Sequence, residues 1–236
     1  MKGWVIVVGA GGLGCATLPL LAAQGLPIRV FDDDVVSLDN LQRQLLFRTA
    51  DVGRPKVEVA EERLRQLFPG VRVEGRAERL GPETLLEVLE DAALVLDGSD
   101  NFPTRFLVND ACVIAGRPLV HGGILRFSGQ VMTILPGESA CYRCLFEDLP
   151  PQGAVPSCSE AGVLGALCGI VGARMVEEAR SVLRGEGRGD RLWVHDARAG
   201  KSRLVPLGRD EGCAVCGDAP EITELDASRY QEVRAA

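Results

Sequence analysis

The chain has 236 residues, of which 46% are hydrophobic, 25% charged and only 5% aromatic, and its formal net charge is −7. This length and apolar fraction suit one sizeable α/β domain, while the negative charge argues against general binding to nucleic acid or to an anionic membrane surface. The eight cysteines are too few for a disulfide scaffold of this size, yet they call for an explanation.

The N-terminal stretch carries no charge between Lys2 and Arg29, as in a signal peptide or a membrane span. Its apolar core, Val5–Val8, is too short for a signal peptide, and glycines interrupt the run. We therefore expect a buried strand over Trp4–Val8 and a buried helix over Leu13–Gln24, in a cytoplasmic protein that does not enter a membrane.

Strand and helix patterns then alternate as far as residue 122. Strands are expected at Ile28–Phe31, Val71–Val73, Ala93–Asp97 and Leu119–His121, and helices at Pro55–Phe68, Pro82–Glu90 and Phe102–Ala115. This alternation predicts a doubly wound, mostly parallel, Rossmann-like sheet. Beyond Gly129 we expect antiparallel strands at Val131–Leu135, Leu192–His195 and Arg203–Leu207, with one long glycine-rich helix over Ala161–Leu183.

A glycine-rich turn joins the first strand to the first helix. Gly9, Gly11, Gly12 and Gly14 fit the pattern G-x-G-x-x-G, which lets the backbone approach a phosphate at a helix N-terminus. Asp32 ends the next strand and is placed to accept hydrogen bonds from ribose hydroxyls. The pattern predicts a nucleotide site without choosing between NAD and ATP, and the alternative is a bare packing turn.

The segment Val35–Arg54 is polar and too long to be a mere connector. Within it Arg43 provides a cation, and Lys56 opens the next helix with a second one. A triphosphate needs two cations because charge develops on the leaving pyrophosphate, whereas a dinucleotide rarely does. The alternative is a solvated surface loop with ordinary charges.

A second polar segment, Asp97–Asn101, follows the fourth strand at the carboxyl edge of the sheet, where open α/β folds bind ligands. We expect the carboxylate of Asp100 to hold Mg²⁺ on the phosphates. The alternative is that a residue of this segment, such as Ser99 or Asn101, only caps the following helix.

Together these segments resemble the E1-like activating enzymes of the ThiF/MoeB/HesA type. The similarity lies in GAGGLG, DDDVVSLDNLQRQ, GRPK, DGSDNFPTR, CYRC and CAVC, and runs from about residue 4 to 217. The resemblance implies that the protein uses Mg·ATP to adenylate the C-terminal glycine of a small ubiquitin-like sulfur carrier ending in Gly-Gly. The adenylated carrier would serve sulfur incorporation into a cofactor or a thiolated nucleoside.

The resemblance also implies a role for individual residues. Gly11 is assigned to the phosphate turn, Asp32 to the ribose and Asp100 to Mg²⁺. The expected nucleotide set is Gly9, Gly11, Gly12, Gly14, Asp32, Asp34, Asn40, Arg43, Gln44, Lys56, Asp100 and Asn101, and the expected catalytic set is Arg43, Lys56, Asp100 and Cys158.

Two further hypotheses stay open at this point. An NAD(P)-dependent oxidoreductase explains the glycine turn and Asp32 but leaves Arg43 and Lys56 without a role. Relatives of the resembling family carry an N-terminal arm whose arginine reaches the ATP of the neighbouring subunit, and a first strand at Trp4 leaves no room for that arm. A non-catalytic carrier-binding scaffold is therefore the third hypothesis.

Five cysteines receive a specific prediction. Cys141, Cys144, Cys213 and Cys216 form two C-x-x-C pairs, which predict a structural tetrahedral zinc site, with a redox motif or two disulfides as alternatives. Cys158 lies in a polar loop before the long helix, where a helix N-terminus favours thiolate. The resemblance implies a covalent bond to the carrier or sulfur transfer at this position, and the alternative is an ordinary loop cysteine.

The other reactive side chains have plainer interpretations. Cys15, Cys112 and Cys168 are most simply core residues, and His121 and His195 are core or edge histidines. Arg105 either supports the phosphate site or pairs with an acid, and Arg126 is a weaker candidate of the same kind.

The expected organisation is a single domain over residues 1–220, with a nucleotide half at about 1–125 and a carrier and zinc half at about 126–220. A polar tail follows at 221–236. The long glycine-rich helix and the resemblance together predict a homodimer.

Overall fold

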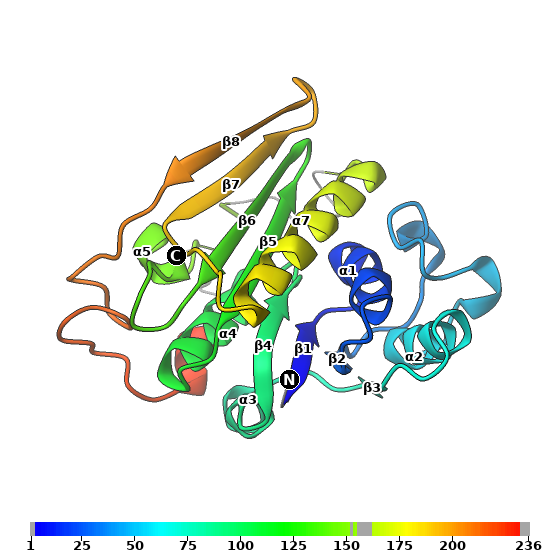
Figure 1. Ribbon diagram of the computed structural model, residues 1–236, viewed down its shortest axis with the longest axis horizontal. Helices are drawn as coiled ribbons and strands as arrows, with labels where there is room; N and C mark the ends of the chain where they lie inside the picture. The colour runs from blue at the N-terminus through cyan, green and yellow to red at the C-terminus, as the bar shows by residue number, and fades with distance from the viewer. Residues whose placement is uncertain (1–2, 152, 155–161, 232–236) are drawn as a thin grey trace.

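The computed structural model describes residues 3–151, 153–154 and 162–231 (Figure 1). Its centre is an eight-stranded sheet with the order β3-β2-β1-β4-β5-β6-β7-β8. The strands are β1 (Trp4–Val8), β2 (Ile28–Phe31), β3 (Val73–Arg76), β4 (Ala92–Asp97), β5 (Leu119–Leu125), β6 (Ser128–Ile134), β7 (Arg191–Asp196) and β8 (Lys201–Pro206). The strands from β1 to β5 run parallel, and β6, β7 and β8 are antiparallel additions, so the expected fold class is confirmed.

Helices cover both faces of the sheet (Figure 1). One layer contains α1 (Gly12–Ala22), α2 (Lys56–Leu67) and α7 (Gly165–Leu183), and the other contains α3 (Pro82–Leu89), α4 (Phe102–Ile114) and α5 (Tyr142–Leu145). Short 3₁₀ turns occur at η1 (Leu38–Asn40), η2 (Thr49–Asp51) and η3 (Ala227–Tyr230). All five residues of β1 are buried because its alternating side chains enter the apolar cores on the two faces.

The long helix α7 lies unusually close to its neighbours. A Cβ at Gly172 would stand 2.6 Å from the Cβ of Ala16 on α1, and a Cβ at Gly122 on β5 would stand 2.3 Å from the Sδ of Met175. Glycine at these positions therefore allows the helix to approach α1 and the sheet. The helix begins at Gly165 and not near 161, since Gly162 has a φ of +71° and is not helical.

Several strands have bounds that differ from the sequence prediction, and β6, for example, begins at Ser128 instead of Val131. β3 begins at Val73 and ends at Arg76, later than the expected Val71–Val73, and β5 extends to Leu125 instead of ending at His121. Gly122 and Gly123 continue the strand, and β6 pairs with both. Glycine here makes room for neighbouring side chains, which the sequence pattern does not reveal.

The segment expected to be a loose polar tail is partly docked in the described residues, which end at residue 231. Ile222 and Tyr230 are buried, and the Tyr230 hydroxyl donates to Oδ2 of Asp110 at 3.0 Å. Burying these side chains against α4 offsets the entropy of ordering the chain.

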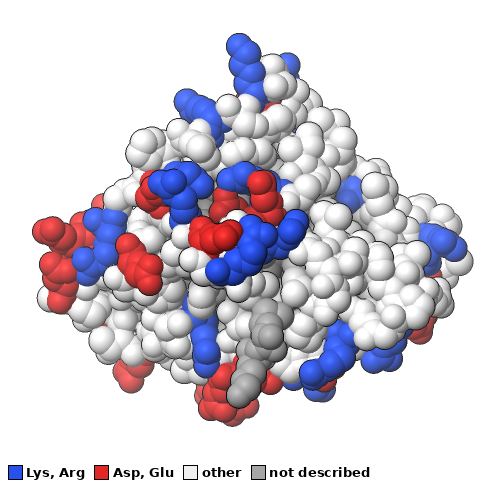
Figure 2. Space-filling model, viewed as in Figure 1, with Lys and Arg blue, Asp and Glu red and all other residues white. Residues whose placement is uncertain are grey.

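The surface seen in Figure 2 carries basic and acidic side chains next to one another. On α7, Arg174 pairs with Glu177 and Glu178. Among the described residues, no helix is both long and apolar enough to cross a membrane.

Candidate nucleotide site and cysteine cluster

The main cavity lies where the strand order reverses, at the carboxyl ends of β1 and β4. It has a volume of about 470 Å³. Open α/β sheets bind ligands in this crevice because the connections leave β1 and β4 toward opposite faces. Most of the expected nucleotide residues line it, namely Gly9, Gly11, Gly12, Asp32, Asp34, Asn40, Arg43, Gln44, Lys56 and Asp100.

The glycine turn shapes one wall of this cavity. Gly9 has a φ of +94°, which favours glycine, and Gly11 is the N-cap of α1 with no side chain over the helix N-terminus. Gly14 is absent from the cavity lining. A Cβ at Gly14 would lie 2.1 Å from the carbonyl oxygen of Gly9, so this glycine lets the turn close on α1.

Asp32 ties the end of β2 to the glycine turn. Its Oδ2 accepts from the backbone N–H of Ala10 at 2.7 Å, and its Oδ1 accepts from the N–H of Asp34 at 2.9 Å. Burial raises the pKa of the Asp32 carboxyl, although Lys56 and the two N–H donors act in the opposite direction. The carboxylate is thus held rigidly at the edge of the cavity.

Lys56 is buried at the start of α2, with only 3% of its surface exposed. Its Nζ lies 2.7 Å from Oδ2 of Asp34 and 3.9 Å from Oδ1 of Asp32. The two carboxylates hold the Lys56 amino group in place at the cavity.

The segment around η1 adds a second cation opposite the glycine turn. Nη2 of Arg43 donates to Oδ1 of Asn40, whose Nδ2 in turn donates to Oγ of Ser37. Gln44 is buried, its Nε2 faces Gly11, and its Oε1 has no hydrogen-bond partner among the described residues. A buried acceptor without a partner at the cavity fits a site that is completed by a ligand.

The residues that follow β4, Asp100 and Asn101, have different surroundings. Asp100 is exposed in the cavity and has no ion-pair partner in the described part of the chain. Asn101 is the N-cap of α4, where its Oδ1 accepts from the N–H of Thr104 at 2.9 Å. Asn101 lines a smaller neighbouring cavity of about 210 Å³ and not the main one. Its side chain caps α4, which was the alternative interpretation from the sequence.

A second cavity, of about 320 Å³, adjoins the main one, and the sequence did not reveal it. The two cavities share Asp100, Arg105 and Ile124 in their linings. The rest of the second cavity is mostly apolar and comes from four elements, through Phe102, Gly123, Leu125, Ser128, Gln130, Tyr142 and Phe146. Because these residues are far apart in the chain, no local pattern could bring them together.

His121 is a buried histidine with an unexpected partner. Its Nδ1 lies 2.8 Å from Oδ2 of Asp97, while its Nε2 has no hydrogen-bond partner among the described residues. Its ring stacks edge-on against Tyr142, with 4.8 Å between ring centroids. The sequence singled out neither Asp97 nor Tyr142. His195 is half-buried on β7, between β6 and β8, with Nδ1 2.9 Å from Oγ of Ser202.

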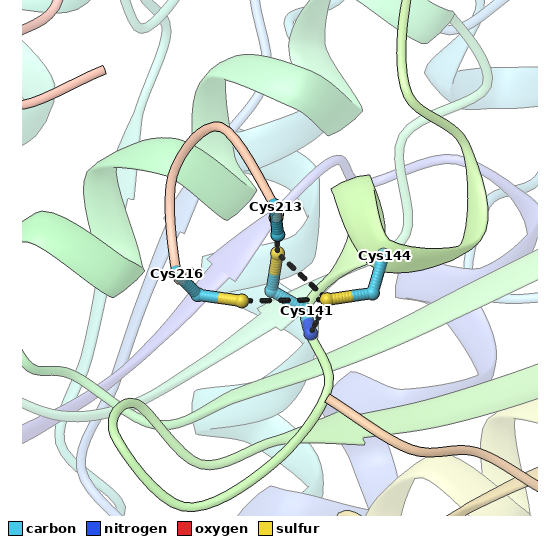
Figure 3. Close-up of side chains that lie close together, drawn as sticks. All are labelled: Cys141, Cys144, Cys213 and Cys216. Atoms are coloured by element: carbon cyan, nitrogen blue, oxygen red, sulfur yellow. Dashed lines mark hydrogen bonds between the residues drawn. The ribbon is translucent and has the colours of Figure 1, made fainter. Parts of the chain in front are cut away.

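The two C-x-x-C pairs form one cluster (Figure 3). Their four sulfur atoms lie within 4.8 Å of one another, with 3.6 Å between Cys141 and Cys213 and 3.3 Å between Cys144 and Cys216. Four sulfurs bound to zinc at 2.3 Å in a tetrahedron would be about 3.8 Å apart. The donor set and its spacing therefore fit a tetrahedral metal site, and the four thiols are unbridged.

The remaining cysteines are in different surroundings. Cys158 lies outside the described residues, so its proposed reactivity stays a prediction. Cys15 and Cys112 are buried, as expected, and burial raises the pKa of the Cys15 thiol to about 12. Cys168 is also buried but lines the nucleotide cavity, with its Sγ 2.8 Å from the position of a Cβ at Gly12.

Comparison with known proteins decides the family. The chain matches the model described as the ThiF family over residues 2–215. The chain belongs to the ThiF family. This membership agrees with the location of the glycine turn, Arg43, Lys56 and Asp100 around one cavity.

The chain is similar in sequence to several named proteins. It is 50% identical to the sulfur carrier protein adenylyltransferase of Thermus thermophilus, over 94% of this chain and 84% of the relative. It is 46% identical to the SAMP-activating enzyme E1 of Haloferax volcanii, with the same coverage of both chains. Its identity to the adenylyltransferase and sulfurtransferase MOCS3 of Sus scrofa is 42%, over 94% of this chain and 50% of that one.

Solved structures confirm the architecture. The crystal structure of MccB from E. coli superposes with a TM-score of 0.80 at 22% identity, over 92% of this chain and 66% of MccB. The ThiF-family chain thus spans about two thirds of the length of MccB, and at this identity the likeness concerns the fold alone.

Proposed function

We propose that this protein adenylates the C-terminal glycine of a small ubiquitin-like sulfur carrier at the expense of ATP and releases pyrophosphate. One observation carries the proposal: the glycine turn, Arg43, Lys56 and Asp100 converge on one cavity. The names of relatives with 42–50% identity, which are adenylyltransferases and an E1 activating enzyme, support the same reaction. The adenylated carrier would serve sulfur incorporation into a cofactor or a thiolated nucleoside.

The chemistry asks for positioning and for charge neutralisation. An oxygen of the carrier's terminal carboxylate attacks the α-phosphorus of ATP, and the bond from that phosphorus to the bridging oxygen of the β-phosphate breaks. The carboxylate is already ionised at neutral pH, so the step needs no general base. The protein accelerates it by holding the two reactants together and by stabilising the charge that develops on pyrophosphate.

Different residues of the main cavity bind different parts of the nucleotide in this proposal. Arg43 and Lys56 bind the triphosphate, and Asn40 holds the Arg43 guanidinium in place. Asp32 accepts from the ribose hydroxyls at the end of β2. Asp100 would hold Mg²⁺, which when bound neutralises charge on the phosphates.

The carrier's C-terminal tail enters through the second cavity. This cavity opens onto the nucleotide cavity along Asp100, Arg105 and Ile124, so a carboxylate at its inner end meets the nucleotide. Its apolar walls suit an extended chain that ends in two residues without side chains.

The cysteine cluster holds Zn²⁺ in a structural role in this proposal, because four thiolates close all positions of a tetrahedral ion. We also propose a homodimer through the face that exposes Leu20 on α1 and Ile170 on α7, which are 40% and 42% exposed. Light scattering of the wild type and of Ile170→Glu tests the dimer, and a monomeric wild type would contradict it.

Carrier-dependent exchange of labelled pyrophosphate into ATP tests the function. The wild type should catalyse exchange only when a Gly-Gly carrier is present. Arg43→Ala and Lys56→Ala should each reduce the exchange rate about 100-fold or more, because each removes a charge that stabilises the transition state.

Arg48→Ala is the matched control for this experiment. Arg48 belongs to the same segment as Arg43, but it is exposed and lies outside the cavity lining. It should keep the wild-type rate. Absence of exchange with every Gly-Gly carrier tried would contradict adenylation, and carrier binding without exchange would favour a scaffold.

A further inference from the structure

Arg105 stands at the junction of the two cavities. It lies in the first turn of α4 and lines both the nucleotide cavity and the second cavity. It is also the one cation in the lining of the second cavity, whose other charged lining residue is Asp100. Any ligand that passes from one cavity into the other therefore passes this guanidinium.

The side chain is held in place from one side. Its Nε and Nη2 both donate to the carbonyl oxygen of Ser99, at 3.2 and 3.1 Å, and its guanidinium carbon lies 5.2 Å from the centre of the Phe102 ring. A guanidinium has five N–H donors in a planar fork, and the bonds to Ser99 leave the others available. The group is thus oriented before any ligand arrives, which lowers the entropic cost of binding.

The charge of Arg105 has no counter-ion in the described part of the chain. Its Nε and Nη2 bond to Ser99, its guanidinium lies beside the hydroxyl of Tyr142, and no carboxylate of the described residues forms an ion pair with it. Arg143, which is buried, shows the contrast, because its Nε and Nη2 bond to the carboxylate of Asp110. A half-buried, oriented and uncompensated cation is a site for an anion.

Two anions meet at this junction, the nucleotide phosphates and the carboxylate of the carrier tail. The phosphate side already has Arg43, Lys56 and the N-terminus of α1. In the second cavity Arg105 is the one cation among the described residues, beside Asp100 and a lining that is mostly apolar. Charge complementarity therefore favours the carboxylate.

We propose that Arg105 anchors the terminal carboxylate of the carrier at the junction of the two cavities, an inference that rests on the proposed function. One carboxylate oxygen accepts from the free N–H donors of Arg105, and the other oxygen attacks the α-phosphorus. The new bond joins this oxygen to phosphorus, the bond to the bridging oxygen of pyrophosphate breaks, and no proton is transferred. Arg105 thus makes the enzyme select a free carboxylate at the end of the tail.

The experiment compares two forms of one Gly-Gly carrier, the natural free acid and a C-terminal glycinamide that lacks the negative charge. Binding is measured with a non-hydrolysable ATP analogue present. The wild type should bind the acid about 10- to 100-fold more tightly than the amide, as expected for a charge-assisted hydrogen bond. Arg105→Gln should lose this preference by weakening acid binding alone, with affinity for the ATP analogue within about twofold of the wild type.

Two further variants make the comparison sharper. Arg105→Lys keeps the charge without the fork and should retain part of the acid preference. Arg117→Gln is the matched control, since Arg117 follows the same helix and donates to the carbonyl of Glu90, yet lines neither cavity. It should bind both carriers as the wild type does.

Each outcome separates this inference from the proposed function. Equal weakening of acid and amide by Arg105→Gln, or no preference in a wild type that still catalyses pyrophosphate exchange, overturns the role of Arg105 alone. If Arg105→Gln weakens binding of the ATP analogue alone, Arg105 binds the phosphates and its proposed role toward the carboxylate is overturned. If the wild type neither binds a carrier nor catalyses exchange, both the role of Arg105 and the proposed function are overturned.

Discussion

Asp97 and His121 are register partners on the neighbouring parallel strands β4 and β5, and Nδ1 of His121 lies 2.8 Å from Oδ2 of Asp97. Both side chains are buried, and the backbone N–H of Ser99 also donates to Oδ1 of Asp97. The pair joins the end of β4 to β5 just before Asp100 and Gly123, which line the second cavity.

Burial sets the protonation of this pair. It lowers the pKa of His121, although Asp97 opposes the shift. Burial would raise the pKa of Asp97, but the hydrogen bonds from His121 and Ser99 outweigh it and the pKa is lowered. At neutral pH a neutral imidazole therefore donates its Nδ1–H to an ionised carboxylate.

The first prediction concerns the stability of the protein in mild acid. Because the folded pKa of His121 is below its unfolded value of about 6.5, its contribution to stability is complete above that pH and is lost as the pH falls toward the folded pKa. Asp97 adds to this at lower pH, since its contribution is complete above about 3.9 and is lost as the pH falls through its lowered folded pKa. Urea unfolding should give a smaller free energy of unfolding at pH 5 than at pH 7.5.

His121→Gln should flatten this dependence, because glutamine can still donate to Asp97 but does not titrate. His195→Gln is the control, since His195 is the other histidine of the chain and is only half-buried on β7, away from Asp97. An unchanged slope in His121→Gln would show that other groups cause the pH dependence.

The second prediction concerns Gly14. The methyl group of Gly14→Ala would lie 2.1 Å from the Gly9 carbonyl oxygen, and that backbone cannot move without opening the turn. We expect a loss of about 1–3 kcal/mol in the free energy of unfolding, as for other overpacked sites. Gly169→Ala on α7 is the control, because no atom lies within 4 Å of a Cβ at that position. This substitution should stabilise the helix by up to about 1 kcal/mol. Equal effects of the two changes would contradict the clash.

The third prediction concerns the cysteine cluster. The purified protein should contain about one zinc ion per chain, and a chelator should lower the melting temperature, because the metal joins segments that are 72 residues apart between Cys141 and Cys213. Cys213→Ser should lose the metal, whereas Cys112→Ser should keep it, since Cys112 is buried outside the cluster. Metal analysis by mass spectrometry measures both, and a wild type without tightly bound metal would rule the site out.

The fourth prediction concerns Asn40 as a positioning residue. Asn40→Ala frees the Arg43 guanidinium that it now holds, so the KM for ATP in the exchange assay should rise about tenfold while the KM for the carrier changes little. Ser37→Ala removes the acceptor behind Asn40 and the hydrogen bond from Ser37 to Asp39, but it leaves the contact between Asn40 and Arg43 in place and should have a smaller effect. A similar rise in both KM values for Asn40→Ala would indicate general damage to the segment.

Local sequence predicted the elements that local forces create. The buried strand β1, the glycine turn and the α2 helix follow from short-range patterns of apolar residues, glycine and proline, and the structure has them at or near the expected residues. The two C-x-x-C pairs could also be identified from the sequence, because two thiols on one tight turn have a short fixed spacing.

Other predictions failed or were out of reach for a physical reason. The prediction ended this strand at His121, while in the structure β5 continues through Gly122, which makes room for Met175, and Gly123, and both pair with β6. The polar segment at residues 221–231 looked like a tail, and only the position of Asp110 on α4 gives Tyr230 a buried partner.

The sequence by itself determined the fold class, the glycine turn, the two cations that line the main cavity and the four clustered thiols, since each is encoded by residue types at short fixed spacings. The tertiary structure alone decided which residues share a cavity. It brought Arg105 between two cavities without a counter-ion in the described residues, and it paired Asp97 with His121 through the β4–β5 register. Such relationships depend on how distant segments pack, and no spacing along one chain specifies them.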